Sequence, residues 1–312
     1  MANMRHSATN ERIYTGTRER QSIAPDRIEG GWTVISRLAG ILARAFLVVL
    51  LIATPSVLLV NTTPDTTQIV VLVAILAAVF TMVEYNSTYP SLVEFRDAPP
   101  FNRIRFLSLF TTVFVLTVIA RGKDAPTTIT LFFNALGSRI GELIDFPYSP
   151  VRLVVLMMPS DADDALIESV RTAAGLSYLV SILSLAIFVL ILRGKGWPRQ
   201  LGGFNVWINL PTFDPTAGGD VVDRLKRDGH VNLILGFLLP FIIPAFVKLA
   251  ADMFNPVSLA NDHTLIWTMT AWAFLPASLI MRGIAMMRVA QMIVDQRARA
   301  YAVSKFAGAL PA

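Results

Sequence analysis

Residues 173–192 read AAGLSYLVSILSLAIFVLIL, twenty residues in succession without a charged side chain. The hydrocarbon core of a bilayer is about 30 Å thick and an α-helix rises about 1.5 Å per residue, so roughly 20 apolar residues are needed to cross it. A peptide group left without a hydrogen bond in lipid costs several kcal/mol, so a crossing segment must be helical. This stretch therefore predicts a transmembrane helix.

Five further apolar runs lie on either side of this segment, at residues 38–60, 69–85, 106–120, 231–251 and 264–287. Two of them, 69–85 and 106–120, are shorter than a full crossing, and we expect flanking residues to complete them. Thr66 and Thr67 precede the run 69–85. Arg103 and Arg105 precede the run 106–120, and we expect their side chains to extend to the lipid head groups. The pattern predicts an all-α fold, a polytopic bundle of about six transmembrane helices.

The basic residues alternate between connections and so predict an orientation. Of the 27 Lys and Arg residues, seven precede the middle of the first run, three lie in 87–105, six in 193–230, and five follow from residue 282 onward. The connections at 61–67 and 252–263 contain none. Because cytoplasmic loops carry the excess of Lys and Arg, both termini are predicted to be cytoplasmic. A bacterial inner membrane suits this arrangement.

The composition excludes several classes of protein. A chain of 312 residues with 54% hydrophobic residues and a mean hydropathy of +0.57 is too apolar for a soluble domain. The net charge of +5 does not predict nucleic-acid binding, because the excess lies at the predicted cytoplasmic ends of the helices. With no cysteine and only three histidines, none of them inside a predicted helix, we expect no cofactor.

Three regions are predicted along the chain. Residues 1–34 form a polar cytoplasmic tail whose composition is typical of disorder, 35–292 form the six-helix transmembrane domain, and 293–312 form a cytoplasmic C-terminal tail. The transmembrane domain includes an outer segment at 121–172 and a cytoplasmic loop at 193–230, in which 220–227 is expected to form a short helix.

The outer segment has an amphipathic pattern of its own. In residues 127–146 apolar side chains recur every three or four positions, which predicts a helix that lies in the periplasmic membrane interface. The apolar stretch 151–158 is too short to span, and is interpreted as either surface-docked or re-entrant. Ser160 is the expected N-cap of the following helix. The aspartates after it suit the positive end of that helix, with a cation site as the alternative.

Three charged residues fall inside predicted spans near their cytoplasmic ends: Arg44, Glu84 and Arg282. A charge inside a bilayer costs about 2.5 to 3.5 kcal/mol on insertion scales, so each needs a partner or a role. One hypothesis makes Glu84 a proton or cation carrier gated by either arginine. The other makes Glu84 part of an ion pair that fixes helix packing while the arginines extend to head groups.

The run at 231–251 contains a candidate helix-kink site, Gly236, Pro240 and Pro244. Each proline removes a backbone hydrogen bond, which would open a solute site if the helix unwinds there. Prolines also occur in membrane helices without any such role. Asp252, Asp262 and His263 are the candidates for a metal site, with a solvated rim as the preferred interpretation.

No nucleophile with an adjacent base appears in any loop, so no enzymatic activity is predicted. The middle of the predicted bundle holds apolar residues with a few Ser and Thr, whereas a coupled transporter usually has an ionisable or unwound site there. We therefore expect a non-enzymatic component or assembly partner of a membrane complex. Its expected contacts are the lipid bilayer and either a membrane-protein partner or another copy of the chain. The alternative is a channel or secondary transporter for a small solute or ion.

Overall fold

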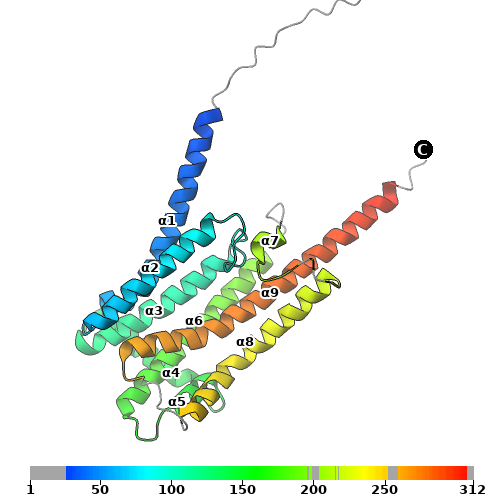
Figure 1. Ribbon diagram of the computed structural model, residues 1–312. Coiled ribbons are helices and arrows are strands. Elements are labelled where there is room, and N and C mark those ends of the chain that lie inside the picture. The colour runs from blue at the N-terminus through cyan, green and yellow to red at the C-terminus, as the bar shows by residue number, and fades with distance from the viewer. Residues whose placement is uncertain are drawn as a thin grey trace, which may run out of the picture. The chain divides into compact units, whose positions relative to one another are not determined.

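The fold is seen in a computed structural model that describes residues 26–194, 197–198, 204–214, 216, 218–251 and 259–307. The predicted tail over residues 1–25 lies outside these residues. Regular structure in the described residues is helical throughout (Figure 1). The helices are α1 (Asp26–Leu58), α2 (Pro64–Asn86), α3 (Phe101–Asp124), α4 (Thr128–Ile144), α5 (Pro150–Leu156), α6 (Asp164–Gly194), α7 (Val206–Asn209), α8 (Val221–Ala251) and α9 (Asp262–Ala307).

Six helices in this part of the chain are long and apolar enough to cross a membrane: α1, α2, α3, α6, α8 and α9. Five of the six predicted runs lie wholly inside these helices, and the run 38–60 extends two residues past the end of α1, so the prediction of a multi-pass helical membrane protein is confirmed. The two short runs are completed as expected by helical flanks, which give α2 23 residues and α3 24 residues. The Thr63 side chain caps α2 by accepting from the Thr66 N–H.

Several helix ends differ from the predicted boundaries. The expected short helix at 220–227 is the first part of α8, which begins where the Asp220 side chain accepts from the Val222 N–H. This cap lets one helix run from the loop into the membrane without a break. Helix α1 begins at Asp26, inside the region assigned to the tail, and α9 continues past residue 292 to Ala307. Figure 1 shows α9 running on beyond α8.

The described residues from 41 onward form one compact unit, in which α3, α6, α8 and α9 lie side by side (Figure 1). Two apolar clusters fill this unit, one toward α4 and α5 and the other toward the loops at 87–100 and 204–214. The first is centred on Val113, Ala174 and Met269, and the second on Phe101, Phe188 and Met286. We call the corresponding ends of the bundle the α4–α5 end and the loop end.

Glycines bring α8 and α9 into close contact. A Cβ on Gly283 of α9 would lie 2.6 Å from the carbonyl oxygen of Gly229 in α8. A Cβ on Gly236 would lie 2.7 Å from the Pro276 carbonyl oxygen and 2.6 Å from the Ile280 side chain. Glycine permits this approach because it has a hydrogen in place of a side chain. Small residues stabilise pairs of membrane helices in this way, by letting their backbones come close together.

At the loop end, the described parts of the two connections fold onto the bundle. The N–H of Phe95 donates to the Asn209 carbonyl at 2.7 Å, which joins the 87–100 loop to α7. Phe95 is buried and adopts a positive φ of 51°, a conformation that costs an ordinary residue about 1 kcal/mol or more. Its ring packs on Phe101 and Trp197 with centroids 4.5 and 5.8 Å away, and this packing offsets the strain.

At the α4–α5 end, the helix predicted at 127–146 is present as α4, which starts at a capping box formed by Thr127 and Thr130. It packs against α6 where a Cβ on Gly175 would lie 2.6 Å from the Cα of Gly141. The predicted start of α6 at Ser160 is wrong, because Ser160 and Asp161 lie in a turn and the helix begins at Asp164. The 151–158 stretch forms α5 and buries Val151 and Val154 against the bundle.

Candidate functional site

A charged cluster closes the loop end. Arg282 of α9 donates through Nε and Nη2 to the two carboxylate oxygens of Glu94, at 2.6 and 2.8 Å. Its Nη1 donates to the Asn232 side chain on α8 at 3.0 Å, and Thr212 donates to Glu94 at 2.7 Å. The side chains of Arg282 and Glu94 are 27% and 11% exposed, so this two-pronged pair is largely shielded from water. It connects α8, α9 and both loops, and we call it the Glu94–Arg282 cluster.

Arg105 lies beside this cluster without extending to the surface. Its guanidinium carbon is 5.0 Å from the Phe101 ring centroid and 5.8 Å from that of Phe274. Its Nε is buried and has no hydrogen-bond partner in the described residues. The expectation that Arg105 extends to the head groups is therefore wrong, because its charge is placed over aromatic faces, which attract cations.

The three predicted intramembrane charges do not form one site. Arg282 pairs with Glu94 rather than with Glu84. Glu84 accepts hydrogen bonds at 3.0 to 3.2 Å from the backbone N–H groups of Ser91, Leu92 and Val93, and another from the Ser91 hydroxyl. The Arg44 guanidinium carbon lies 4.7 Å from the centre of the Tyr85 ring. Glu84 thus anchors the loop that places Glu94, while Arg44 packs α1 against α2.

At the predicted kink site the described α8 remains one helix through Pro240 and Pro244. Proline at 244 has no N–H, so the carbonyl of Pro240 lacks its donor four residues later. Trp272 of α9 supplies one, with Nε1 donating to the Pro240 oxygen at 3.2 Å. The backbone group freed by the proline is therefore used to lock α8 to α9. Gly236, one turn before, provides the close approach described above.

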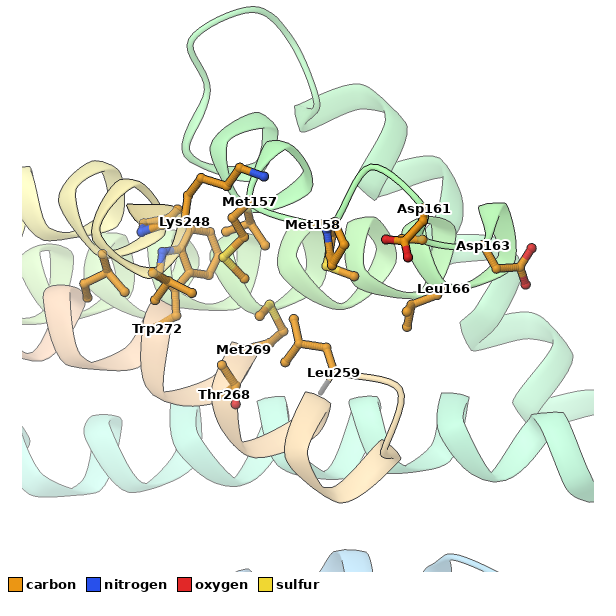
Figure 2. Close-up of a pocket in the computed structure, with 16 residues that line it drawn as sticks. Met157, Met158, Asp161, Asp163, Leu166, Lys248, Leu259, Thr268, Met269 and Trp272 are labelled. Carbon is orange, nitrogen blue, oxygen red and sulfur yellow. The ribbon is translucent and has the colours of Figure 1, made fainter. Parts of the chain in front are cut away.

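A cavity of about 580 Å³ lies beside Pro244 at the α4–α5 end (Figure 2). Its walls come from α5, the loop to α6, the start of α6, and facing parts of α8 and α9. Its apolar lining includes three methionines and Trp272, and among the described residues its charged lining consists of Lys248, Asp161 and Asp163. Figure 2 shows Lys248 toward one end of the lining and the two aspartates toward the other.

A smaller cavity of about 250 Å³ lies between α3, α4, α6 and α9 and includes Glu168 and Lys123 in its lining. Its charged groups already have partners. Ser138 donates to Glu168, Arg171 also pairs with Glu168, and Lys123 pairs with Asp262 at 2.8 Å. These contacts hold α4 against α6 and α3 against the start of α9.

The middle of the bundle has no charged path. Residues 106–120, 172–192, 231–247 and 264–281 contain no Asp, Glu, Lys or Arg. Several buried hydroxyls there donate to their own helices, as when Thr117 donates to the Val113 carbonyl at 2.6 Å and Ser177 to that of Ala173 at 2.7 Å. The Thr270 hydroxyl on α9 is also buried and has no hydrogen-bond partner among the described residues. One unpartnered hydroxyl cannot by itself replace the water shell of an ion, which takes several oxygen ligands.

No group of three or more Asp, Glu or His that could hold a metal ion occurs in the described part of the chain. Of the three predicted candidates, Asp262 pairs with Lys123, and His263 Nε2 lies 3.3 Å from the Ser56 hydroxyl. Asp252 lies outside the described residues. No protein-family model, curated protein or solved structure matches the chain.

Proposed function

We propose that this protein is a non-enzymatic component of a membrane assembly, which acts by packing against a partner protein or a second copy of itself. The observation that carries the proposal is the uncharged interior. The central stretches of four helices have no charge, and the Glu94–Arg282 cluster seals the loop end with residues from four elements. A pore or a coupled carrier needs polar groups at the midplane that are free to meet the solute.

Helix α9 supplies a surface for such a partner. Its 46 residues correspond to about 69 Å, more than twice the hydrocarbon thickness of about 30 Å, so its C-terminal part must project from the bilayer. Residues 296–303 of this part are exposed, including Tyr301 and Val303 at 75% and 68%. Because residues two positions apart on a helix point to opposite sides, Tyr301 and Val303 provide apolar contacts on two sides of the projecting helix.

The distribution of basic residues supports an orientation with the loop end and both termini in the cytoplasm of a bacterium and the protein in its inner membrane. In this orientation α4 lies at the periplasmic side. Its exposed apolar residues, among them Ile129, Phe132 and Leu143, support a position in the membrane interface.

The proposal is tested by photo-cross-linking in native membranes. A photoreactive phenylalanine analogue replaces Tyr301, and in a matched control it replaces Tyr148, which is 89% exposed at the α4–α5 end. We expect one discrete product, with a second copy or with one membrane protein, at position 301 and not at 148. Equal labelling at both positions, or saturable solute flux through proteoliposomes that hold the purified chain alone, would contradict it.

The cavity beside Pro244 is the observation that favours the alternative, a secondary transporter, because it lies beside the point where α8 lacks a backbone hydrogen bond. The same proteoliposomes decide between the two. If the chain transports, Pro244→Ala should change the flux by restoring the backbone donor to α8. If flux is absent from both forms, the alternative fails.

A further inference from the structure

The cavity beside Pro244 has the properties of a lipid site. Its volume of about 580 Å³ lies within the range of roughly 300 to 1,000 Å³ that ligand pockets occupy. Its walls include Val154 of α5, Leu166 of α6 and Met269 of α9. Apolar cavities do not hold water well, whereas flexible methionine side chains adapt to an alkyl chain.

One side of the cavity is rigid. The Trp272 ring is fixed by its hydrogen bond to the Pro240 carbonyl and by stacking on Tyr178, with centroids 5.8 Å apart and an interplanar angle of 30°. Pro244 beside it is buried. A preformed wall of this kind lowers the entropic cost of ordering a bound chain.

The surroundings of the cavity are lipid. The part of α8 that lines the cavity with Ile243 and Val247 lies at the surface of the bundle: Val247 is partly exposed, and Phe246 and Leu249 are more so. In a helix that crosses the membrane, such side chains contact acyl chains. The molecules at highest concentration beside the cavity are therefore the phospholipids of the bilayer.

The charges in the lining favour one kind of head group. Lys248 lies in the last turn of α8 and has no hydrogen-bond or ion-pair partner within the described ranges. A Lys side chain near a helix end extends toward the membrane surface, where it meets phosphates. Asp161 and Asp163, at the opposite end of the lining, are exposed carboxylates (Figure 2). Two carboxylates and one ammonium disfavour a net anionic head group and complement one that also carries an ammonium.

We propose that this cavity binds one zwitterionic phospholipid with a primary ammonium, which places an acyl chain against Met269 and Trp272 and its phosphate at Lys248. The ammonium of the head group faces Asp161 and Asp163. The proposal is independent of the assembly role, since a bound lipid is compatible with an assembly component or a transporter.

Native mass spectrometry of the purified full chain tests it, with phosphatidylethanolamine and phosphatidylglycerol added at equal concentration. Val247→Trp fills the cavity from α8, and Leu249→Trp places the same ring on the lipid-facing side as a control. We expect one bound phosphatidylethanolamine on the wild type and on Leu249→Trp, and at least about tenfold weaker retention on Val247→Trp.

The head-group assignment is tested separately and does not depend on the folding of the tryptophan variant. Lys248→Gln should weaken retention about tenfold, since a hydrogen bond to a charged group is lost, and Lys248→Arg should restore it. Lys123→Gln, which removes a lysine paired with Asp262, should have no effect. Equal or preferential binding of phosphatidylglycerol, unchanged retention in Lys248→Gln, or no lipid on the wild type would overturn the proposal.

Discussion

Arg282 lies in a membrane-spanning helix, where an unpaired guanidinium costs about 2.5 to 3.5 kcal/mol on insertion scales. The structure meets this cost with a two-pronged pair to Glu94 and a third bond to Asn232. Glu94 stands in a loop, held in place because Glu84 binds the preceding backbone N–H groups of residues 91–93. The Glu84 carboxylate thus positions the loop, and the Glu94 carboxylate, held by that loop, pairs with Arg282.

Removing the charge of Glu94 should destabilise the fold. Glu94→Gln leaves Arg282 largely shielded from water and without its counter-ion, and breaking such a pair costs about 3 kcal/mol. We expect a clear fall in the thermal unfolding midpoint of the detergent-solubilised protein. The control is Glu142→Gln, whose pair with Arg139 is exposed and should contribute less than about 1 kcal/mol. Equal midpoints for the two variants would show that the Glu94–Arg282 cluster does not stabilise the bundle.

Glu84 has a different predicted role, which hydrogen exchange can detect. In Glu84→Gln one oxygen becomes an NH2 group, which cannot accept from a backbone N–H. We expect faster amide exchange at Leu92 and Val93, whose N–H groups bond to Glu84. Asp65→Asn, at the exposed start of the same helix, should leave these amides unchanged. Unaltered exchange in both variants would refute the anchoring role.

At the scale of elements, α8 and α9 depend on close approach. Gly283→Ala should destabilise the bundle by about 1 to 3 kcal/mol, because the new methyl group would lie 2.6 Å from the Gly229 carbonyl and backbone must move. Gly218→Ala is the control, since a Cβ there meets nothing within 4 Å. If the thermal unfolding midpoint of Gly283→Ala were as high as that of the control, the close approach of α8 and α9 would not contribute to the stability of the bundle.

The projecting part of α9 is attached to the start of α8 by Arg297, which donates to both oxygens of Asp220 at 2.9 and 3.0 Å. This hydrogen bonding lowers the pKa of Asp220 below its ordinary value of about 4. A lowered pKa means that the contact stabilises at neutral pH and is lost as pH falls below about 4 and Asp220 is protonated. We expect amide protection around residue 297 to be constant from about pH 7 to 5 and to fall at lower pH. In Asp220→Asn we expect the amides around residue 297 to show the same low protection at every pH, because the carboxylate is absent.

The sequence predicts some of these elements better than others, for physical reasons. Transmembrane runs are evident because nearly all residues over about 20 positions must be apolar, and a helix is present at each of the six. The first residue of a helix is harder to predict. Whether α6 begins after Ser160 or at Asp164 depends on how the preceding turn packs around α5. The partner of Arg282 was missed because no spacing relates residue 94 to residue 282. The sequence offers one signal: a charge inside a span needs a counter-ion, and Glu94 is an acidic residue in a cytoplasmic connection, between Pro90 and Pro99.

For the whole molecule, the orientation in the membrane is the property on which the proposals about location depend. The chain has no cysteine, so a single introduced cysteine reports its compartment without background. Tyr89 at the loop end and Tyr148 at the α4–α5 end are 69% and 89% exposed and suit this purpose, whereas Leu210 is buried and does not. We expect an impermeant thiol reagent added to intact cells to label Tyr148→Cys, and to label Tyr89→Cys only after the cells are opened. The physical reason is that an odd number of crossings, made by α3, separates the two positions. Labelling of both from the outside would contradict the crossing by α3, and labelling of Tyr89→Cys alone would invert the predicted orientation.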